Sequence, residues 1–336
     1  MQKNAILITG AAGEIGQALL ADLAAGGKGP LVTLDLQAMP AGAQLSQHVQ
    51  GSVADQALLA GLAEQYQFAQ IFHLAALLST SAERKPSLAH QVNVDASVLL
   101  LELAARQSME GGQPVQVIFP SSIAVYGMPD LATKAAHAKV GEGDFNDPTT
   151  MYGCNKLAVE KLGAYYSSQY GQLQAEIPTR LDFRSLRFPG LISAHTAPTG
   201  GTSDYGPEML HAAAQGQAYA CFVRPDTTIP FMAMPDAVRA LLGLAAAPAA
   251  ALSRRAYNVG AFSLSAEAFA GQVQAAFPRA EISYAPNAPR QGIVDTWPLD
   301  VDDRAARADW GWASQYDLQR CFDEYLVPNI RQRYQA

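Results

Sequence analysis

The feature that most constrains the fold of this chain is a glycine-rich turn between an apolar run and a helical pattern. Residues 4–9 (NAILIT) are typical of a buried strand, and GAAGEIG follows at once at residues 10–16. Gly10 allows a tight turn, Gly13 lets the backbone approach a diphosphate, and Gly16 lets the helix pack closely on the strand. The order of strand, glycine turn and helix predicts a dinucleotide site in a parallel α/β sheet.

A second apolar run, residues 31–34, ends at Asp35. A carboxylate at this place accepts hydrogen bonds from a ribose 2′-hydroxyl and repels a 2′-phosphate. The residues that follow, LQAMPAG, contain no Arg or Lys that would bind such a phosphate. The pattern therefore favours NAD over NADP, with the diphosphate at the helix N-terminus near Glu14 and Ile15.

Composition argues against several other classes of protein. The 336 residues are 49% hydrophobic and 16% charged, which is typical of a globular protein and not of a disordered or fibrous one. The formal net charge of −7 argues against a nucleic-acid surface. Three widely separated cysteines predict neither a disulfide framework nor a metal site. Without a signal-peptide pattern or an apolar stretch long enough to span a bilayer, we expect a cytoplasmic protein with no membrane partner.

Strand and helix patterns continue to alternate after Asp35. GSVAD at residues 51–55 precedes a helix, and Ser52 and Val53 lie where contacts to an adenine are usual. The next strand, residues 71–74, ends at Leu74 and leads into the small residues Ala75 and Ala76, which leave room for a cofactor at the carboxyl end of the sheet. His73 is interpreted as a packed core histidine.

The stretch from Pro86 to about Arg106 predicts one long helix, because its apolar residues recur at helical spacing. Asn93 is polar among apolar neighbours in this helix. Two interpretations stay open for it: a structural bridge between helix and sheet, or the ordering of a water near the active site.

The residues that indicate chemistry lie between 121 and 156. The apolar strand at 115–119 ends in PSS, so Ser122 is expected at the carboxyl edge of the sheet. Tyr152 and Lys156 are four residues apart and share one face of a helix. A phenol has a pKa of about 10, and a nearby ammonium lowers it, so this pair predicts a base for oxidising an alcohol. A Tyr-x-x-x-Lys alone is more often a surface pair, and here the glycine turn and Asp35 favour the catalytic interpretation.

These patterns together predict an α/β fold, a Rossmann-type doubly wound parallel sheet with a smaller, mostly helical C-terminal substrate lobe. We expect an NAD-binding domain at residues 1–190, its sheet completed by later segments around 225–260. The substrate-binding lobe is expected at residues 191–336, interleaved with the first domain.

The glycine turn, Asp35, HLAA at 73–76, Ser122 and the Tyr-x-x-x-Lys pair together resemble the extended short-chain dehydrogenase/reductase superfamily of NAD-dependent epimerases and dehydratases. Longer strings resemble its group of L-threonine 3-dehydrogenases: PSSIAVYG, SLRFPGLIS, TGGTSDY, DTTIPFMAMPDAVRA, YNVGAFSLSAEAF and DTWPLDVDDRAARADWGW. The resemblance implies oxidation of the β-hydroxyl of L-threonine by NAD, giving 2-amino-3-oxobutanoate. A sugar-nucleotide epimerase, another extended short-chain dehydrogenase acting on a hydroxy acid, and an NAD-sensing regulator are the alternatives, although such regulators usually lack the Tyr/Lys pair.

The resemblance also implies roles for individual residues. Ser122, Tyr152 and Lys156 are expected to be catalytic, with Tyr152 as the base, Lys156 on the nicotinamide ribose and Ser122 on the substrate hydroxyl. The residues expected to bind NAD are Gly10, Gly13, Glu14, Ile15, Gly16, Asp35, Leu36, Ser52, Val53, Leu74, Ala75, Ala76, Asn93, Tyr152, Lys156 and Leu191. Those expected to bind substrate are Ser79, Ser122, Tyr152, Gly190, Gly200, Gly201, Thr202 and Trp297. A core role for Trp297 is an equal alternative.

Two stretches depart from the pattern of that group. The loops around 128–150 and 172–180 are longer, and both flank the expected site. By the same resemblance we expect a homodimer, paired as a four-helix bundle through the helices at 92–106 and 157–170.

Overall fold

The structure is a computed structural model that describes residues 2–173, 180–198 and 200–335. Its largest sheet has seven strands in the order β10-β6-β5-β4-β1-β2-β3. The strands are β1 (Gln2–Thr9), β2 (Leu31–Asp35), β3 (Gln47–Gln50), β4 (Tyr66–His73), β5 (Val115–Ser122), β6 (Leu181–Phe188) and β10 (Ala256–Asn258). β1 pairs in parallel with β2 and β4, β2 with β3, and β4 with β5. The predicted Rossmann-type sheet is confirmed.

The strand order reverses at β1, and this reversal decides where a ligand binds. Strands β2 and β3 lie on one side of β1, and β4, β5 and β6 lie on the other. Thr9 is in register with Leu34 of β2 and with His73 of β4, so three strands end together. In open α/β sheets, ligands bind outside the carboxyl ends of the strands at such a reversal.

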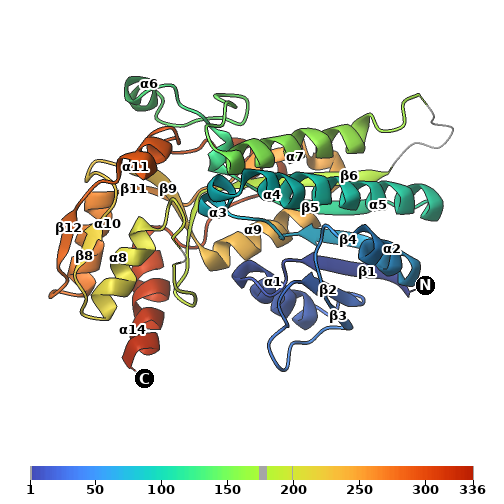
Figure 1. Ribbon diagram of the computed structural model, residues 1–336, viewed down its shortest axis with the longest axis horizontal. Coiled ribbons are helices and arrows are strands. Elements are labelled where there is room, and N and C mark those ends of the chain that lie inside the picture. The colour runs from blue at the N-terminus through green and yellow to red at the C-terminus, as the bar shows by residue number, and fades with distance from the viewer. Residues whose placement is uncertain (1, 174–179, 199, 336) are drawn as a thin grey trace. The chain divides into compact units, whose positions relative to one another are not determined.

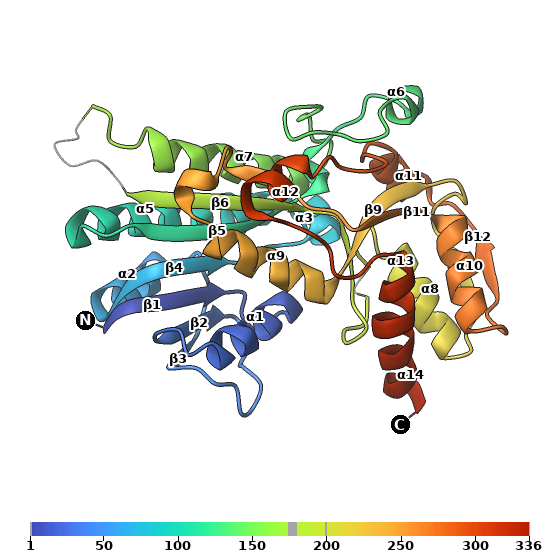
Figure 2. The ribbon, with the colours of Figure 1, turned by 180° about the vertical axis from the view of Figure 1, so that it is seen from behind.

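Helices cover both faces of this sheet (Figures 1 and 2). Helices α2 (Gln56–Gln65), α5 (Ala96–Gly111) and α7 (Met151–Ser168) lie on one face, with α5 and α7 side by side. Helices α1 (Glu14–Ala25) and α9 (Met234–Ala246) lie on the other. The helix expected after GSVAD is α2, and Asp55 caps it, because its carboxylate accepts a hydrogen bond from Leu58 N.

The core of this part of the chain is the apolar layer between the sheet and the α2, α5 and α7 face. Strand residues such as Leu7, Phe68 and Phe183 are fully buried in it, and Leu100 and Val159 meet them from α5 and α7. Each such side chain contributes roughly 1.5–3 kcal/mol of hydrophobic stabilisation. This layer fixes the helices against the strands whose ends carry the candidate site.

The prediction of one regular helix at residues 86–106 is wrong in one respect, because a π-helical turn interrupts it. The structure has α4 (Pro86–His90), a π-helical turn (Gln91–Asp95) and then α5, preceded by α3 (Ser79–Arg84). Asn93 lies in the π-helical turn and is buried. Its Oδ1 accepts a hydrogen bond from Leu77 N (2.7 Å), and its Nδ2 donates one to Leu77 O (3.0 Å). The turn aims the amide at this backbone, and π-helical turns of this kind often occur at functional sites.

The remaining elements form two smaller sheets and a set of helices. One sheet has the order β11-β9-β7 and the other pairs β12 with β8. The strands are β7 (Gly190–Ile192), β8 (Tyr219–Cys221), β9 (Thr228–Ala233), β11 (Phe262–Ser265) and β12 (Ile282–Tyr284). The helices are α6 (Leu131–Ala136), α8 (Tyr205–Ala214), α10 (Ala266–Ala276), α11 (Ala288–Asp295), α12 (Arg304–Trp310), α13 (Leu318–Arg320), a π-helical segment (Cys321–Leu326) and α14 (Val327–Gln335). Ser265 is the N-cap of α10, and its hydroxyl accepts a hydrogen bond from Ala268 N (3.1 Å).

The chain divides into two interleaved units. The first unit holds residues 1–121, 154–186 and 238–257, and the second holds 122–153, 187–237 and 258–336. The expected division at residue 190 differs from these units chiefly at residues 122–153, which group with the later part of the chain. The loop that leads from Ser122 to Tyr152 therefore belongs to the second unit.

Candidate active site

The glycine turn after β1 is as tight as its sequence suggests. Gly10 has a φ of +68°, and a β-carbon there would lie 2.6 Å from Ala75 N, on the segment that follows β4. A β-carbon at Gly16 would lie 2.6 Å from the Ala11 Cα. Both positions therefore require glycine, one for backbone conformation and close approach, the other for packing of α1 on the turn.

Asp35 ties the end of β2 to this turn. Its Oδ2 accepts a hydrogen bond from Ala12 N (2.9 Å) and its Oδ1 accepts one from Gln37 N (2.9 Å). Gly13 is the N-cap of α1 in an extended conformation, and as a glycine it has no side chain that could cap the helix. A first turn open to an anion, next to a fixed carboxylate, fits the diphosphate and ribose of NAD.

The other residues expected to bind NAD follow the strands as predicted, with different exposures. Leu74, Ala75 and Ala76 are partly buried, and Val53 is buried. The Ser52 hydroxyl accepts a hydrogen bond from Ala54 N (3.1 Å), and the side chain of Leu36 is 68% exposed. Leu191 lies in β7, in the second unit. Contacts of these residues with NAD stay predictions.

His73 is a satisfied core histidine, as interpreted from the sequence. Its Nδ1 lies 2.8 Å from Thr9 Oγ1, and its Nε2 lies 2.9 Å from Ser97 Oγ. Because the Ser97 hydroxyl donates to Asn93 O, we assign the ring proton to Nε2. Burial, and secondarily the charge of Lys156, lowers the pKa of His73 to about 3. The ring is therefore neutral at ordinary pH and links β1, β4 and α5.

Ser122 and Tyr152 lie on backbone segments that touch. The Ser122 hydroxyl accepts a hydrogen bond from Ala124 N (3.1 Å) in the turn that follows β5. The Thr150 hydroxyl accepts one from Gly153 N (3.1 Å) and so caps the first turn of α7. A β-carbon at Gly153 would overlap Ala124 O. The missing side chain at Gly153 thus lets the start of α7, with Tyr152, rest directly on the turn after Ser122.

Lys156 is buried one turn further along α7. Its Nζ donates a hydrogen bond to Pro120 O (2.7 Å) and lies 4.4 Å from the centre of the Phe119 ring. Burial lowers the pKa of Lys156 to about 7, and nearby Glu160 opposes this shift. The amine is therefore fixed at the carboxyl end of β5 and changes protonation near neutral pH.

The expected effect of Lys156 on Tyr152 is not what the structure has. The sequence spacing predicts that the lysine lowers the pKa of the tyrosine, but burial raises the pKa of Tyr152 above its ordinary value. The physical reason is that the phenol lies in a desolvated place, which disfavours its charged form. The lysine amine meanwhile faces the Pro120 carbonyl.

The loop from Gly127 to Thr150 is fixed along its length within the second unit. Met128 N donates to Thr296 O (2.7 Å), and the hydroxyls of Thr149 and Thr296 are 3.0 Å apart. Between them, the buried Lys134 Nζ donates to Val294 O (3.1 Å). The stretch from α11 to Thr296 therefore holds the beginning, middle and end of this long loop.

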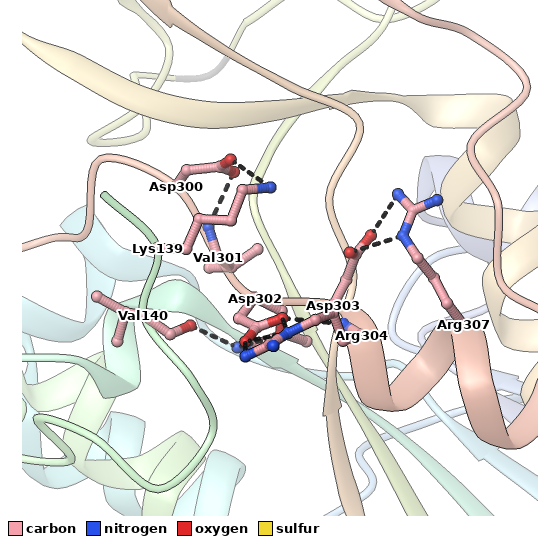
Figure 3. Close-up of polar contacts among 9 residues, drawn as sticks. Lys139, Val140, Asp300, Val301, Asp302, Asp303, Arg304 and Arg307 are labelled. Atoms are coloured by element: carbon pink, nitrogen blue, oxygen red, sulfur yellow. Dashed lines mark hydrogen bonds and ion pairs between the residues drawn. The ribbon is translucent and has the colours of Figure 1, made fainter. Parts of the chain in front are cut away.

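Figure 3 shows how the middle of the loop meets residues 300–307. A cavity of about 420 Å³ is lined by Lys139, Asp302, Asp303, Arg304 and Arg307. Each cation in it has a carboxylate partner: Lys139 with Asp300 (3.0 Å), Arg304 with Asp302 (2.5 Å) and Arg307 with Asp303 (2.8 Å). Opposite charges are thus balanced pairwise, and the cavity has no excess charge for an anionic ligand.

The glycine loop expected to bind substrate is held by side chains on both sides. Gly201 N donates to Asp204 Oδ2 (2.6 Å), and Gly201 O accepts a hydrogen bond from Arg290 Nη2 (2.6 Å). The Gly201 N–H, one of the groups expected to hold a carboxylate, is therefore already used. Arg290 was not among the residues expected to lie at this loop. Its guanidinium also lies 3.2 Å from the centre of the Phe222 ring. Its position in the sequence gives no signal for this contact.

The other expected substrate residues lie in both units. Thr202 and Trp297 are buried in the second unit, and Gly190 begins β7 there. Ser79 begins α3 in the first unit. Most of the expected long loop at 172–180, and Thr199 of the TGGT string, lie outside the described residues.

Comparison with known proteins identifies the family. The chain belongs to the NAD dependent epimerase/dehydratase family, which matches residues 6–260. It is 34% identical over 322 residues to the mitochondrial L-threonine 3-dehydrogenase of Bos taurus, covering 93% of this chain and 79% of that protein. NAD is therefore the cofactor, and the protein is an NAD-dependent oxidoreductase.

Solved structures give the same result. A GalE-like L-threonine dehydrogenase from Cupriavidus necator, in its holo form, is 35% identical with a TM-score of 0.83. A monomeric L-threonine 3-dehydrogenase from a metagenome, in its apo form, is 32% identical with a TM-score of 0.84. Each comparison covers 98% of this chain and 99% of the other chain.

Proposed function

We propose that this protein oxidises the β-hydroxyl of L-threonine to give 2-amino-3-oxobutanoate, with NAD as the oxidant. The observation that carries the proposal is the close packing of Gly153 on Ala124, which sets the helix of Tyr152 against the turn of Ser122. A phenol and a hydroxyl on touching backbone segments suit the deprotonation of an alcohol. The likeness to L-threonine dehydrogenases over nearly the whole chain supports the choice of substrate.

NAD is expected to bind along the turn from Gly10 to Gly16 and at Asp35, and it supplies the hydride acceptor when bound. Tyr152 takes the proton of the substrate hydroxyl while the hydride leaves the same carbon, so that the C–O bond becomes a carbonyl. Ser122 holds the hydroxyl in line. A charged Lys156 ammonium favours the phenolate form of Tyr152, whereas burial of the phenol disfavours that form. The base strength of Tyr152 therefore depends on both effects.

The alternative reaction is that of a sugar-nucleotide epimerase, which oxidises and then re-reduces its substrate. The L-threonine dehydrogenases that the chain resembles over nearly its whole length support the dehydrogenase reaction instead. An epimerase would also end each cycle without net NADH.

The test is the absorbance of NADH after mixing protein, NAD and one substrate at a time. We expect net NADH with L-threonine, and less with L-allo-threonine, L-serine and simple hydroxy acids. UDP-glucose serves as the control for the epimerase reaction, analysed for its 4-epimer. Interconversion of the sugar nucleotide with no NADH from L-threonine would overturn the proposed function.

We also propose a homodimer and a cytoplasmic location in threonine catabolism. No helix in the described ranges of the chain is long and apolar enough to cross a membrane.

The outer face of α5 has a hollow of about 290 Å³, lined by residues of α2 and α5 and by Tyr170. Beside it, Tyr165 of α7 is 43% exposed. A second copy that covers this face would pair α5 and α7 as a four-helix bundle.

A further inference from the structure

One buried side chain connects the turn after Ser122 to the loop that leads to Tyr152. Asn258 is the last residue of β10, and it is fully buried. Its Oδ1 accepts a hydrogen bond from the hydroxyl of Tyr126 (2.7 Å), three residues beyond the start of the turn Ile123–Val125. Its Nδ2 donates to Val140 O (3.0 Å) and to Asp302 O (3.3 Å). The amide thus joins three segments of the second unit.

The same loop position is held by the backbone as well. Val140 forms a parallel bridge with Val301, with bonds from Val140 N to Asp300 O (3.1 Å) and from Asp302 N to Val140 O (2.9 Å). Figure 3 shows this contact, with Lys139 and Asp300 beside it. Asn258 contacts both segments that meet at the bridge, since its Nδ2 donates to the carbonyls of Val140 and Asp302.

A further pair of contacts extends this arrangement. Asn258 N donates to Glu142 Oε1 (3.1 Å), and Arg187 Nη1 donates to Glu142 O (3.0 Å). The Arg187 guanidinium lies 5.0 Å from the centre of the Tyr126 ring. Burial raises the pKa of Tyr126 to about 12, so its hydroxyl stays protonated and able to donate.

The chemistry of the site explains why an asparagine stands at 258. The position needs one acceptor for the tyrosine hydroxyl and two donors for two carbonyls, and a primary amide supplies these in one planar group. An aspartate would lack the donors, and a leucine would remove all three side-chain hydrogen bonds in a buried place. A buried network in which every such group is satisfied holds its segments in one arrangement.

We propose that Asn258, through Tyr126, is a positioning residue that fixes Tyr152 relative to Ser122. The proposal rests on the proposed role of Tyr152 as the base. Tyr126 lies four residues after Ser122, at the end of the turn Ile123–Val125, and Val140 to Glu142 lie in the loop that ends at Thr150, the cap of α7. Holding these two segments on one amide sets where the loop delivers the first turn of α7.

The experiment compares two variants that each remove one buried tyrosine hydroxyl. Tyr126→Phe loses the bond to Asn258 (2.7 Å) and the longer contact of the same hydroxyl with Gly141 O (3.3 Å) in the loop. Tyr66→Phe is the matched control, because the Tyr66 hydroxyl donates to the amide oxygen of Gln47 at 2.7 Å, and both residues belong to the first unit, which does not include this loop. A merely structural role predicts similar losses of Tm and no specific loss of activity in either variant.

We expect Tyr126→Phe alone to lower kcat with L-threonine, by about ten- to a hundredfold, because small misplacements of a catalytic group have effects of this size. The KM for NAD should stay unchanged in both variants. Equal kcat values in Tyr126→Phe and Tyr66→Phe would overturn the proposal. A loss of kcat in Tyr126→Phe matched by a parallel rise in the KM for NAD would overturn it too.

Hydrogen exchange supplies a readout that does not depend on turnover. In Tyr126→Phe, hydrogen exchange should be faster at the amides of Val140 and Asp302 and at those of the first turn of α7. In Tyr66→Phe, the exchange rates of these amides should not change. Asn258→Asp removes the two donor bonds while keeping the acceptor, and it should show the same pattern. Unchanged exchange in folded Asn258→Asp would contradict the proposal.

These results separate the proposal from the proposed function. If wild-type protein forms no NADH from L-threonine, the function fails, and the exchange rates still decide whether Asn258 orders the loop. If Tyr152→Phe keeps its activity, the base assignment fails whatever the result at Tyr126.

Discussion

Gly153 is the residue at which the fold and the proposed chemistry meet most closely. It lies directly after Tyr152, and its backbone packs on the carbonyl of Ala124, in the turn after Ser122. Glycine in a helix interior usually lowers stability relative to alanine by roughly 0.5–1 kcal/mol. The close approach therefore accounts for a residue that helix propensity alone would disfavour.

This contact predicts that two helical glycines respond in opposite ways to the same substitution. Gly153→Ala places a methyl group onto Ala124 O, and we expect it to lower stability by about 1–3 kcal/mol, as overpacking does, and to lower kcat. Gly271→Ala in α10 meets no atom within 4 Å, so it should raise stability by about 0.5–1 kcal/mol. Urea unfolding and kcat with L-threonine measure both effects.

Gly271→Ala serves as the control for helix propensity in that comparison. Gly271 lies in the middle of α10, so Gly271→Ala measures the gain from helix propensity, and a loss of stability in Gly153→Ala reports the contact with Ala124. Equal stabilisation of the two variants, with kcat unchanged in Gly153→Ala, would mean that the first turn of α7 is not held against the turn of Ser122.

The pair of Tyr152 and Lys156 illustrates what residue spacing leaves out. Four-residue spacing places both side chains on one face of α7, as predicted. Whether the pKa of Tyr152 rises or falls depends on burial, which residue spacing does not report. Burial raises this pKa. The lysine contact to Pro120 O depends on the strand β5, thirty-six positions away in sequence.

At the scale of elements, features encoded by neighbouring residues were predictable. The caps Asp55 and Ser265 each bind an N–H three residues on, so the sequence pattern contains the whole interaction. The π-helical turn at Gln91–Asp95 was not predictable in this way. Asn93 binds the backbone of Leu77, in a segment outside that helix, and the helical pattern alone contains no sign of it.

The residues of the candidate site also differ in whether neighbouring sequence alone predicts them. The glycine turn, Asp35 and the Tyr/Lys pair are local patterns, and the sequence located them. The contact between Tyr126 and Asn258 joins residues 132 positions apart. Both residues stand within recognisable strings, PSSIAVYG and YNVG, but only the fold brings them together.

For the whole molecule, alternation of strands and helices predicted a doubly wound parallel sheet, and the order of its strands comes from the structure. The grouping of residues 122–153 with the second unit was not predicted, because it depends on contacts of the loop with α11, Thr296 and residues 300–302. These contacts also mean that the long loop is anchored along its length.

The proposed homodimer is the prediction that belongs to this scale. Analytical ultracentrifugation should give a mass near twice the 35.7 kDa of one chain. Tyr165→Glu, which places a charge on the exposed face of α7, should shift the mass toward one chain, because burying an unpaired charge is unfavourable. Lys161→Gln, at another exposed position of α7, is the control for substitution of that helix. A single-chain mass for the wild-type protein would contradict the dimer.

The central claim is that Tyr152 acts as the base while a hydride leaves the β-carbon of L-threonine. The most direct measurement is the rate at which NAD gains deuterium from L-threonine labelled at that carbon, in wild-type protein and in Tyr152→Phe. We predict that the wild-type protein forms reduced cofactor with one deuterium per molecule, and that Tyr152→Phe is slower by about 10²–10⁴-fold with its affinity for NAD retained. Reduced cofactor without deuterium, or near-normal transfer by Tyr152→Phe, would contradict the account.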